Sequence, residues 1–202
     1  MALTFYYAPM STATLTTAIL AELGVPCERV KLDLKAGDTH KPEFLKLNPN
    51  GVVPLIVHDG TPIWESAAIA MYLGEVFGVD AKLYPEPGPK RGEAMKWIVW
   101  GNVTLGEAAS RLAYALPQGT AGAAAAEKAR TDVAARLKIL DEALANQSFL
   151  LEDYSLADTH LHGFLSWLGL MQFDLKPFTH IQEWLKRCNQ RPALANLLND
   201  AG

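Results

Sequence analysis

Residues 48–66, NPNGVVPLIVHDGTPIWES, decide how the first part of this chain folds. Residues 48–51 are turn-forming, residues 52–57 are rich in β-branched side chains, and Asp59-Gly60 supplies a second turn. A short strand at Ile63-Trp64 would follow, and the apolar spacing after it is helical. This order predicts a β-hairpin that leads directly into a helix.

Pro54 interrupts the first strand of this hairpin. Because proline has no N–H to donate to a neighbouring strand, we expect this strand to lie at a sheet edge and the Val53–Pro54 bond to be cis. The backbone N–H and C=O of Val53 would then face outward. An exposed pair of this kind can hold a peptide.

Glu65 and Ser66 stand where the following helix must begin. The free N–H groups of a helix start and the Ser66 hydroxyl favour a carboxylate, and the Glu65 carboxylate favours an ammonium group. Together these groups predict a receptor for the head group of a free amino acid.

The motif Asn-Pro-X-Gly-X-Val-Pro at 48–54, followed by Glu65-Ser66, resembles the glutathione-binding half of the cytosolic glutathione transferases. The resemblance implies that the Val53 backbone beside Pro54 pairs with the cysteinyl part of glutathione. It also implies that Glu65 and Ser66 take the γ-glutamyl end. The alternative is a thioredoxin-like domain that keeps the proline turn for folding only.

The segments before the hairpin complete an α/β module. Residues 3–7 predict a strand, residues 11–23 a helix capped by Gly24, residues 25–34 a second strand, and residues 35–42 a loose helix. A strand, a helix and a strand followed by a hairpin and a helix are typical of a thioredoxin-like domain.

A linker is expected at residues 83–90, where the sequence LYPEPGPK can sustain neither helix nor strand. It would join a thioredoxin-like domain at 1–82 to an all-helical domain at 91–202, which is the fold of the resembled family. The helices expected in the second domain cover residues 93–116, 123–145, 156–170, 178–189 and 192–198.

The composition limits the classes of partner. The chain has 202 residues, is 50% hydrophobic and carries a formal net charge of −4, which indicates a globular protein and argues against nucleic acid and anionic membranes. Its start resembles a strand and not a leader peptide, and no apolar run is long enough to span a bilayer, so we expect a cytoplasmic protein. Cys27 and Cys188 are far apart in sequence, which predicts neither a disulfide framework nor a metal knuckle.

Two polar patterns receive structural interpretations. Ser155 and Asp158 have the spacing of a capping box that opens a helix at Leu156, and we expect no catalytic role for them. His160 and His162 are two residues apart and therefore lie on different helix faces, so they do not form a metal pair. No metal site is predicted.

Three residues of the loop YAPMSTAT, residues 7–14, are candidates for the group that faces the glutathione sulfur. Ser11 resembles the serine that hydrogen-bonds the thiolate in the phi and theta classes. Thr12 falls where the bacterial beta class carries a cysteine, and Tyr7 lies near the catalytic tyrosine position of the alpha, mu and pi classes. We favour Ser11; its alternative role is that of a helix N-cap, and the two roles are compatible.

The resemblance also implies two outer parts of the site. His40 and Lys41 lie in the segment where family members use basic side chains on the glycyl carboxylate of glutathione. Met10, Tyr114 and Trp167 are the expected apolar walls of a second-substrate pocket against the helical domain.

Two positions depart from the family pattern. Val52 stands where many relatives carry glutamine, so the resemblance implies the loss of a side-chain contact to the tripeptide. Gly106-Glu107 replaces the His-Lys pair of the beta class, so the sequence does not reproduce that pocket and does not identify the electrophile.

The combined beta-, phi- and theta-like features favour a glutathione transferase, an enzyme of detoxification that uses glutathione as its co-substrate. Its thiolate would attack a small hydrophobic electrophile or a peroxide, and the resemblance implies a homodimer. A non-catalytic module of the same fold, used for protein interaction or ligand binding, is the alternative. An isomerase of the zeta type agrees less well, because residues 10–14 lack its Ser-Ser-Cys stretch.

Overall fold

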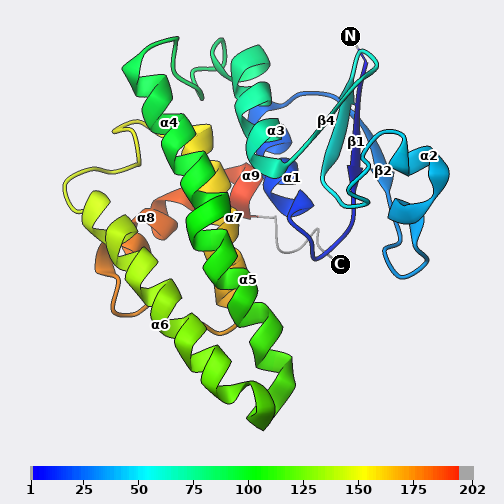
Figure 1. Ribbon diagram of the computed structural model, residues 1–202. Helices are drawn as coiled ribbons and strands as arrows, with labels where there is room; N and C mark the ends of the chain where they lie inside the picture. Colours follow the sequence, from blue (N-terminus) through cyan, green and yellow to red (C-terminus); the bar gives the residue numbers. More distant parts are fainter. Residues whose placement is uncertain (1, 196–202) are drawn as a thin grey trace.

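A computed structural model describes residues 2–195 of the chain (Figure 1). One sheet contains four strands in the order β2-β1-β3-β4. β1 runs parallel to β2 and antiparallel to β3, and β3 is antiparallel to β4. The central strands carry fully buried side chains, among them Phe5 and Ile56. The strands are β1 (Leu3–Tyr7), β2 (Glu28–Lys31), β3 (Leu55–His58) and β4 (Thr61–Trp64).

The expectation that the strand around Pro54 lies at a sheet edge is wrong. β3 begins at Leu55 and pairs with β1 on one side and with β4 on the other, so it is an interior strand. Pro54 precedes the strand, and its missing N–H therefore removes no hydrogen bond from the sheet. The Val53–Pro54 bond is cis, as expected.

The helices of the α/β part are α1 (Ala13–Leu23), α2 (Pro42–Leu45) and α3 (Ser66–Leu73). α1 starts two residues later than predicted, because the residues before Ala13 form a turn in which the Thr14 N–H donates to the Ser11 carbonyl. It ends at Gly24, which adopts a left-handed conformation with φ of 61°. β2 is shorter than the predicted strand, and the expected loose helix is a short 3₁₀ turn, Asp38–His40.

The remaining helices form the second part of the molecule. In Figure 1, α4 and α5 follow one another along one direction, joined by a π-helical segment at Gly101–Leu105, and α6 lies beside α5. The prediction for residues 192–198 falls partly outside the described residues. The helices are α4 (Pro89–Trp100), α5 (Gly106–Ala115), α6 (Gly119–Ala143), α7 (Leu156–Leu170), α8 (Thr179–Cys188) and α9 (Pro192–Ala195).

α7 is the central helix of this part, and its start confirms the predicted capping box. The Ser155 side chain accepts the backbone N–H of Asp158, and the Asp158 carboxylate accepts the backbone N–H of Ser155 at 3.0 Å. Asp158 is fully buried and also accepts hydrogen bonds from the Leu150 N–H and the Trp184 indole. Burial raises the pKa of this carboxyl group, and the hydrogen bonds oppose that rise.

α7 packs directly against α1 of the α/β part, and this contact places the start of α1 beside the helical part. No helix within residues 2–195 combines the length and the apolar character that crossing a bilayer requires.

Candidate functional site

The start of α1 contacts the cis-proline segment through one hydrogen bond. The Thr12 hydroxyl donates to the carbonyl oxygen of Val53 at 3.4 Å. The expectation that both polar groups of Val53 face outward is wrong for the carbonyl, which accepts this hydrogen bond, and Val53 itself is buried. A carbonyl oxygen has two lone pairs, so one of them remains for another donor. Within residues 2–195 the Val53 N–H has no hydrogen-bond partner.

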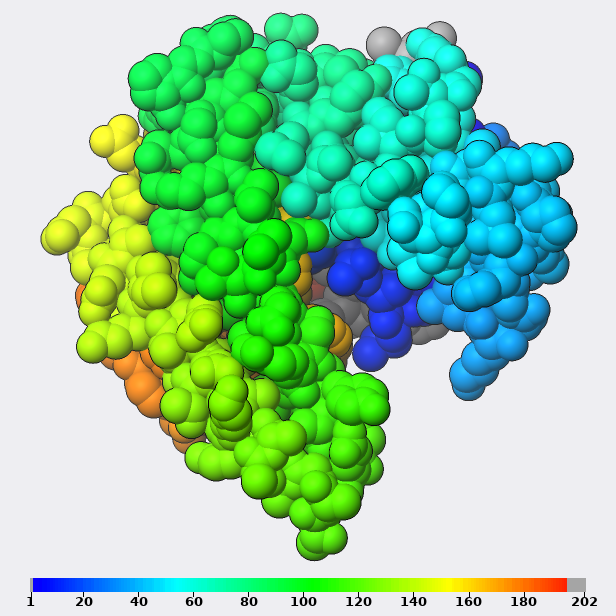
Figure 2. All heavy atoms as spheres, viewed as in Figure 1, coloured from blue at the N-terminus to red at the C-terminus, as the bar shows by residue number. Residues whose placement is uncertain are grey.

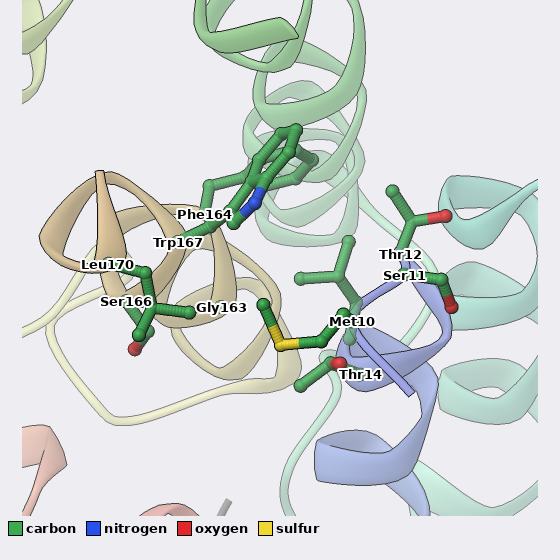
Figure 3. Close-up of a pocket in the computed structure, with 10 residues that line it drawn as sticks. Met10, Ser11, Thr12, Thr14, Gly163, Phe164, Ser166, Trp167 and Leu170 are labelled. Carbon is green, nitrogen blue, oxygen red and sulfur yellow. The ribbon is translucent and has the colours of Figure 1, made fainter. Parts of the chain in front are cut away.

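Ser11 caps the first turn of α1. Its Oγ accepts the Ala13 N–H at 3.2 Å and donates to the Ala8 carbonyl at 2.7 Å. The single hydroxyl proton is thus engaged inside the protein, and donation to a ligand requires rotation of the side chain. Figure 3 shows the Ser11 and Thr12 hydroxyls on the side of the helix start that faces away from Trp167.

A hollow of about 80 Å³ opens between the start of α1 and the second half of α7. Met10 is 68% exposed and reaches across it toward α7 (Figure 3). In Figure 2, the first turn of α1, in blue, lies at the floor of a recess between the helical part and the α/β part. The residues that line the hollow are Met10, Ser11, Thr12, Thr14, Leu15, Gly163, Phe164, Ser166, Trp167 and Leu170.

Of the three side chains expected to wall a second-substrate pocket, the structure brings Met10 and Trp167 together with Ser11. Tyr114 lies elsewhere. It is 78% exposed on α5 and lines a separate groove of about 640 Å³ between α5 and α6. Tyr7 is half-buried at the end of β1, stacks on Phe5 with ring centroids 5.5 Å apart, and is not among the residues of the hollow.

Glu65 and Ser66 begin α3, as the sequence predicts. Glu65 is exposed, has φ of 72°, and its carboxylate has no ion-pair partner within the described residues. A non-glycine residue at positive φ is strained, and such strain is concentrated at functional sites. Ser66 is buried, and its Oγ accepts a hydrogen bond from Asn102 Nδ2 at 2.8 Å.

His40 and Lys41 differ in their surroundings. His40 is exposed, its Nδ1 pairs with Thr39 Oγ1 at 3.0 Å, and its Nε2 would lie 3.5 Å from a Cβ built at Gly51. It therefore lies against the turn that precedes Val53. Lys41 forms an ion pair with Asp38 at 2.7 Å, which raises the pKa of the lysine and lowers that of the aspartate.

The sequence reasoning missed Asn102 as a site residue and considered His160 only as a metal ligand. In the structure His160 Nε2 pairs with Asn102 Oδ1 at 2.6 Å, whereas His162 Nε2 pairs with Asn189 Oδ1 at 2.7 Å. The two histidines face different ways, as predicted. Within residues 2–195 no three His, Cys, Asp or Glu side chains are grouped in a way that could hold a metal ion.

A four-stranded mixed sheet with a cis-proline before its third strand, followed by a helical part, defines the class of fold. Residues 1–75 match the family description "Glutathione S-transferase, N-terminal domain", and residues 103–192 match "Glutathione S-transferase, C-terminal domain". The chain belongs to the glutathione S-transferase family. The predicted fold, a thioredoxin-like α/β domain with an all-helical C-terminal domain, is thereby confirmed.

Individual relatives agree with this assignment. Glutathione S-transferase GstB of Escherichia coli (strain K12) is 30% identical over 185 residues, which are 89% of this chain and 88% of that protein. A delta-class glutathione transferase of Nilaparvata lugens is 29% identical, with a TM-score of 0.88, over 99% of this chain and 92% of that one. The glutathione transferase URE2P6 of Phanerochaete chrysosporium, solved with oxidized glutathione, is 25% identical, with a TM-score of 0.90, over 98% of this chain and 96% of that one.

Proposed function

We propose that the protein is a glutathione transferase that binds reduced glutathione and stabilises its thiolate for attack on a small hydrophobic electrophile or a peroxide. The hydrogen bond between Thr12 and Val53 carries this proposal, because it joins the hydroxyl-bearing start of α1 to the segment expected to hold the tripeptide. The oxidized glutathione bound in the URE2P6 structure supports a ligand that contains the glutathione tripeptide.

Each part of glutathione has a complementary group. The unpaired Val53 N–H and the second lone pair of its carbonyl suit the cysteinyl backbone beside Pro54. At the start of α3, the Glu65 carboxylate suits the γ-glutamyl ammonium, and Ser66 with the helix N–H groups suits the γ-glutamyl carboxylate. His40, with Lys41 beside it, would take the glycyl carboxylate.

Ser11 and the N-terminus of α1 together can supply the free energy that lowers the pKa of the glutathione thiol. A free thiol titrates near ~8.5, and a shift of about two units, which makes it mostly thiolate at neutral pH, corresponds to about 2.7 kcal/mol. One hydrogen bond to a charged group contributes about 1.5–3 kcal/mol, and a helix N-terminus adds about 0.3–1 kcal/mol. Ser11 stands at such a helix start, and its hydroxyl would turn from Ala8 to the sulfur.

Thr12 and Tyr7 are the other candidates for this role. The Thr12 hydroxyl is already close to Val53, where the cysteinyl residue would lie. The Tyr7 ring stacks on Phe5 within the strand layer, which supports Tyr7 least. We therefore keep Ser11 first and Thr12 second.

The second substrate would bind in the hollow walled by Met10 and Trp167. Its mostly apolar lining suits a small hydrophobic molecule. Tyr114 remains a candidate only for a longer substrate, because it lines the separate groove.

The proposal includes a homodimer in the cytoplasm. Each chain would have domains at residues 1–82 and 91–202, joined by the linker at residues 83–90. Exposed apolar side chains at four-residue spacing support a partner surface along α4 and the π-helical segment. These side chains are Met95, Val99 and Val103, with exposed fractions of 37%, 41% and 67%.

The test is a calorimetric titration with reduced glutathione, combined with the ultraviolet absorbance of the bound thiolate against pH. We expect the wild type to bind and to hold the thiol pKa at least about one unit below that of free glutathione. Ser11→Ala should lose this shift, and Ser148→Ala, at an exposed serine far along the chain, should keep it. Absence of binding at millimolar glutathione would overturn the proposal in favour of a non-catalytic interaction module.

A further inference from the structure

Three polar side chains from three separate elements form one hydrogen-bonded chain beneath the start of α3. Ser66 opens α3, Asn102 lies in the π-helical segment between α4 and α5, and His160 lies in α7. Asn102 Nδ2 is 2.8 Å from Ser66 Oγ, and Asn102 Oδ1 is 2.6 Å from His160 Nε2. π-Helical segments are rare and occur often at functional sites.

The chemistry of the groups gives this chain one direction. An amide nitrogen can only donate and an amide oxygen can only accept, so His160 Nε2 donates to Asn102, and Asn102 donates to Ser66. His160 is fully buried, and burial lowers its pKa to about 3, so the ring is neutral and has its one proton on Nε2. Its other nitrogen, Nδ1, has no partner within residues 2–195.

The end of the chain is the Ser66 hydroxyl. Its oxygen already accepts the Asn102 proton, and no acceptor for its own proton is present within the described residues. A serine whose oxygen already accepts a hydrogen bond has its own proton free for a ligand. A free hydroxyl proton is what a serine needs to donate a hydrogen bond to an anion.

We propose that Asn102, fixed by His160, is a positioning residue that keeps Ser66 as a hydrogen-bond donor to the γ-glutamyl carboxylate of glutathione. This inference rests on the proposed function, because it assigns a supporting group to the same binding site. Neither Asn102 nor His160 needs to touch the ligand. The family match and the sequence motif at Glu65-Ser66 do not assign either residue.

The decisive measurement is glutathione affinity by calorimetry for the wild type and four variants. Asn102→Ala removes the donor to Ser66 and should weaken binding about fivefold. An aspartate at position 102 has nearly the shape of asparagine and still accepts a hydrogen bond from His160. In Asn102→Asp the carboxylate also accepts the Ser66 hydroxyl proton, and it places a negative charge near the ligand carboxylate. We expect it to weaken binding by more than about 20-fold, and we expect Ser66→Ala combined with Asn102→Ala to be no weaker than Ser66→Ala alone.

The chain offers a matched control. Asn189 also accepts a hydrogen bond from a buried histidine of α7, His162, at 2.7 Å, but its side chain has no bond to Ser66. Asn189→Ala should therefore lower thermal stability and leave glutathione affinity within about twofold of the wild type. Equal losses in Asn189→Ala and Asn102→Ala would mean that Asn102 acts only through stability.

A second ligand separates positioning from general damage to the site. In a glutathione analogue that carries hydrogen in place of the γ-glutamyl α-carboxylate, Ser66 has no acceptor, so the wild type and Asn102→Ala should bind equally well. If Asn102→Ala loses the same factor against both ligands, or stays within about twofold of wild type for glutathione, the inference is wrong while the proposed function stands. If the wild type binds no glutathione, both fail together.

Discussion

Gly163 of α7 faces Leu15 of α1 so closely that a Cβ at Gly163 would lie 2.2 Å from Leu15 Cδ2. Both residues line the hollow, and Leu15 is only 4% exposed, so its side chain has little room to move. The contact therefore sets the distance between the helix that carries Ser11 and the helix that carries Trp167.

We expect Gly163→Ala to lower the free energy of unfolding by about 1–3 kcal/mol, because the added methyl group forces α1 and α7 apart. Urea unfolding measures this change. Gly169→Ala on the same helix is the control, since a Cβ there meets no atom within 4 Å and should gain up to about 1 kcal/mol from helix propensity. Similar values for the two variants would contradict the role of the contact.

Trp167→Ala should separate the two substrates of the proposed reaction. Trp167 lines the hollow beside Met10, whereas Ser66 and Glu65 do not line it, so we expect the KM for a hydrophobic electrophile to rise about tenfold while glutathione affinity stays unchanged. Steady-state kinetics with varied electrophile and calorimetry with glutathione give the two values. Ile139→Ala, at an exposed residue of α6 outside the hollow, is the control. A parallel loss of glutathione affinity would place Trp167 in the other subsite.

Stability should fall as the pH drops below about 6.5, because burial lowers the folded-state pKa of His160 to about 3 and also lowers that of His162. In this window the unfolded chain binds protons that the folded chain excludes, which favours unfolding. Each histidine can contribute a slope of up to about 1.4 kcal/mol per pH unit.

Urea unfolding at several pH values from 7.5 downward tests this expectation, with pH steps of about one unit. His160→Gln should have a shallower slope than the wild type, because the amide does not titrate. His160→Gln combined with His162→Gln should be shallower still. Equal slopes in all three proteins would show that neither histidine is kept neutral by the fold.

Local signals in the sequence predicted much of the fold, and tertiary contacts explain most of what they missed. The capping box at Ser155 and Asp158 fixed the start of α7 correctly, because all its hydrogen bonds lie within one helical turn. The edge-strand interpretation of Pro54 failed because it assumed that the strand included the proline. β3 is an interior strand because it pairs with β1, which lies about fifty residues earlier in the chain, and a local sequence pattern does not show this pairing.

Local sequence signals likewise predicted only part of the candidate site. The Glu65-Ser66 pair and the helix start were visible in the sequence, because they are adjacent residues. Asn102 was not, since its role comes from a π-helical segment that turns it toward Ser66 and His160. The sequence predicted a helix over residues 93–116 but could not show that Tyr114 faces the α5–α6 groove instead of Trp167.

Glu22 of α1 and Arg191, which precedes α9, form an ion pair between the two parts of the molecule. Arg191 Nε and Nη2 donate to the two carboxylate oxygens of Glu22 at 2.7 and 2.6 Å, and the guanidinium lies 3.8 Å from the Tyr154 ring centroid. The Glu22 side chain is only 3% exposed. Arg191→Leu should therefore lower the free energy of unfolding by about 3 kcal/mol, because a buried carboxylate is left without its cation.

The double-mutant cycle identifies the cause. Glu22→Gln combined with Arg191→Leu should be more stable than Arg191→Leu alone, since no unpaired charge remains buried. The exposed pair of Lys138 and Glu142 is the control, because its side chains are 75% and 68% exposed and Lys138→Ala should change stability by less than about 0.5 kcal/mol. If the effects of Glu22→Gln and Arg191→Leu add, the pair is not coupled, and the packing of Arg191 on Tyr154 carries the stabilisation that joins the two parts.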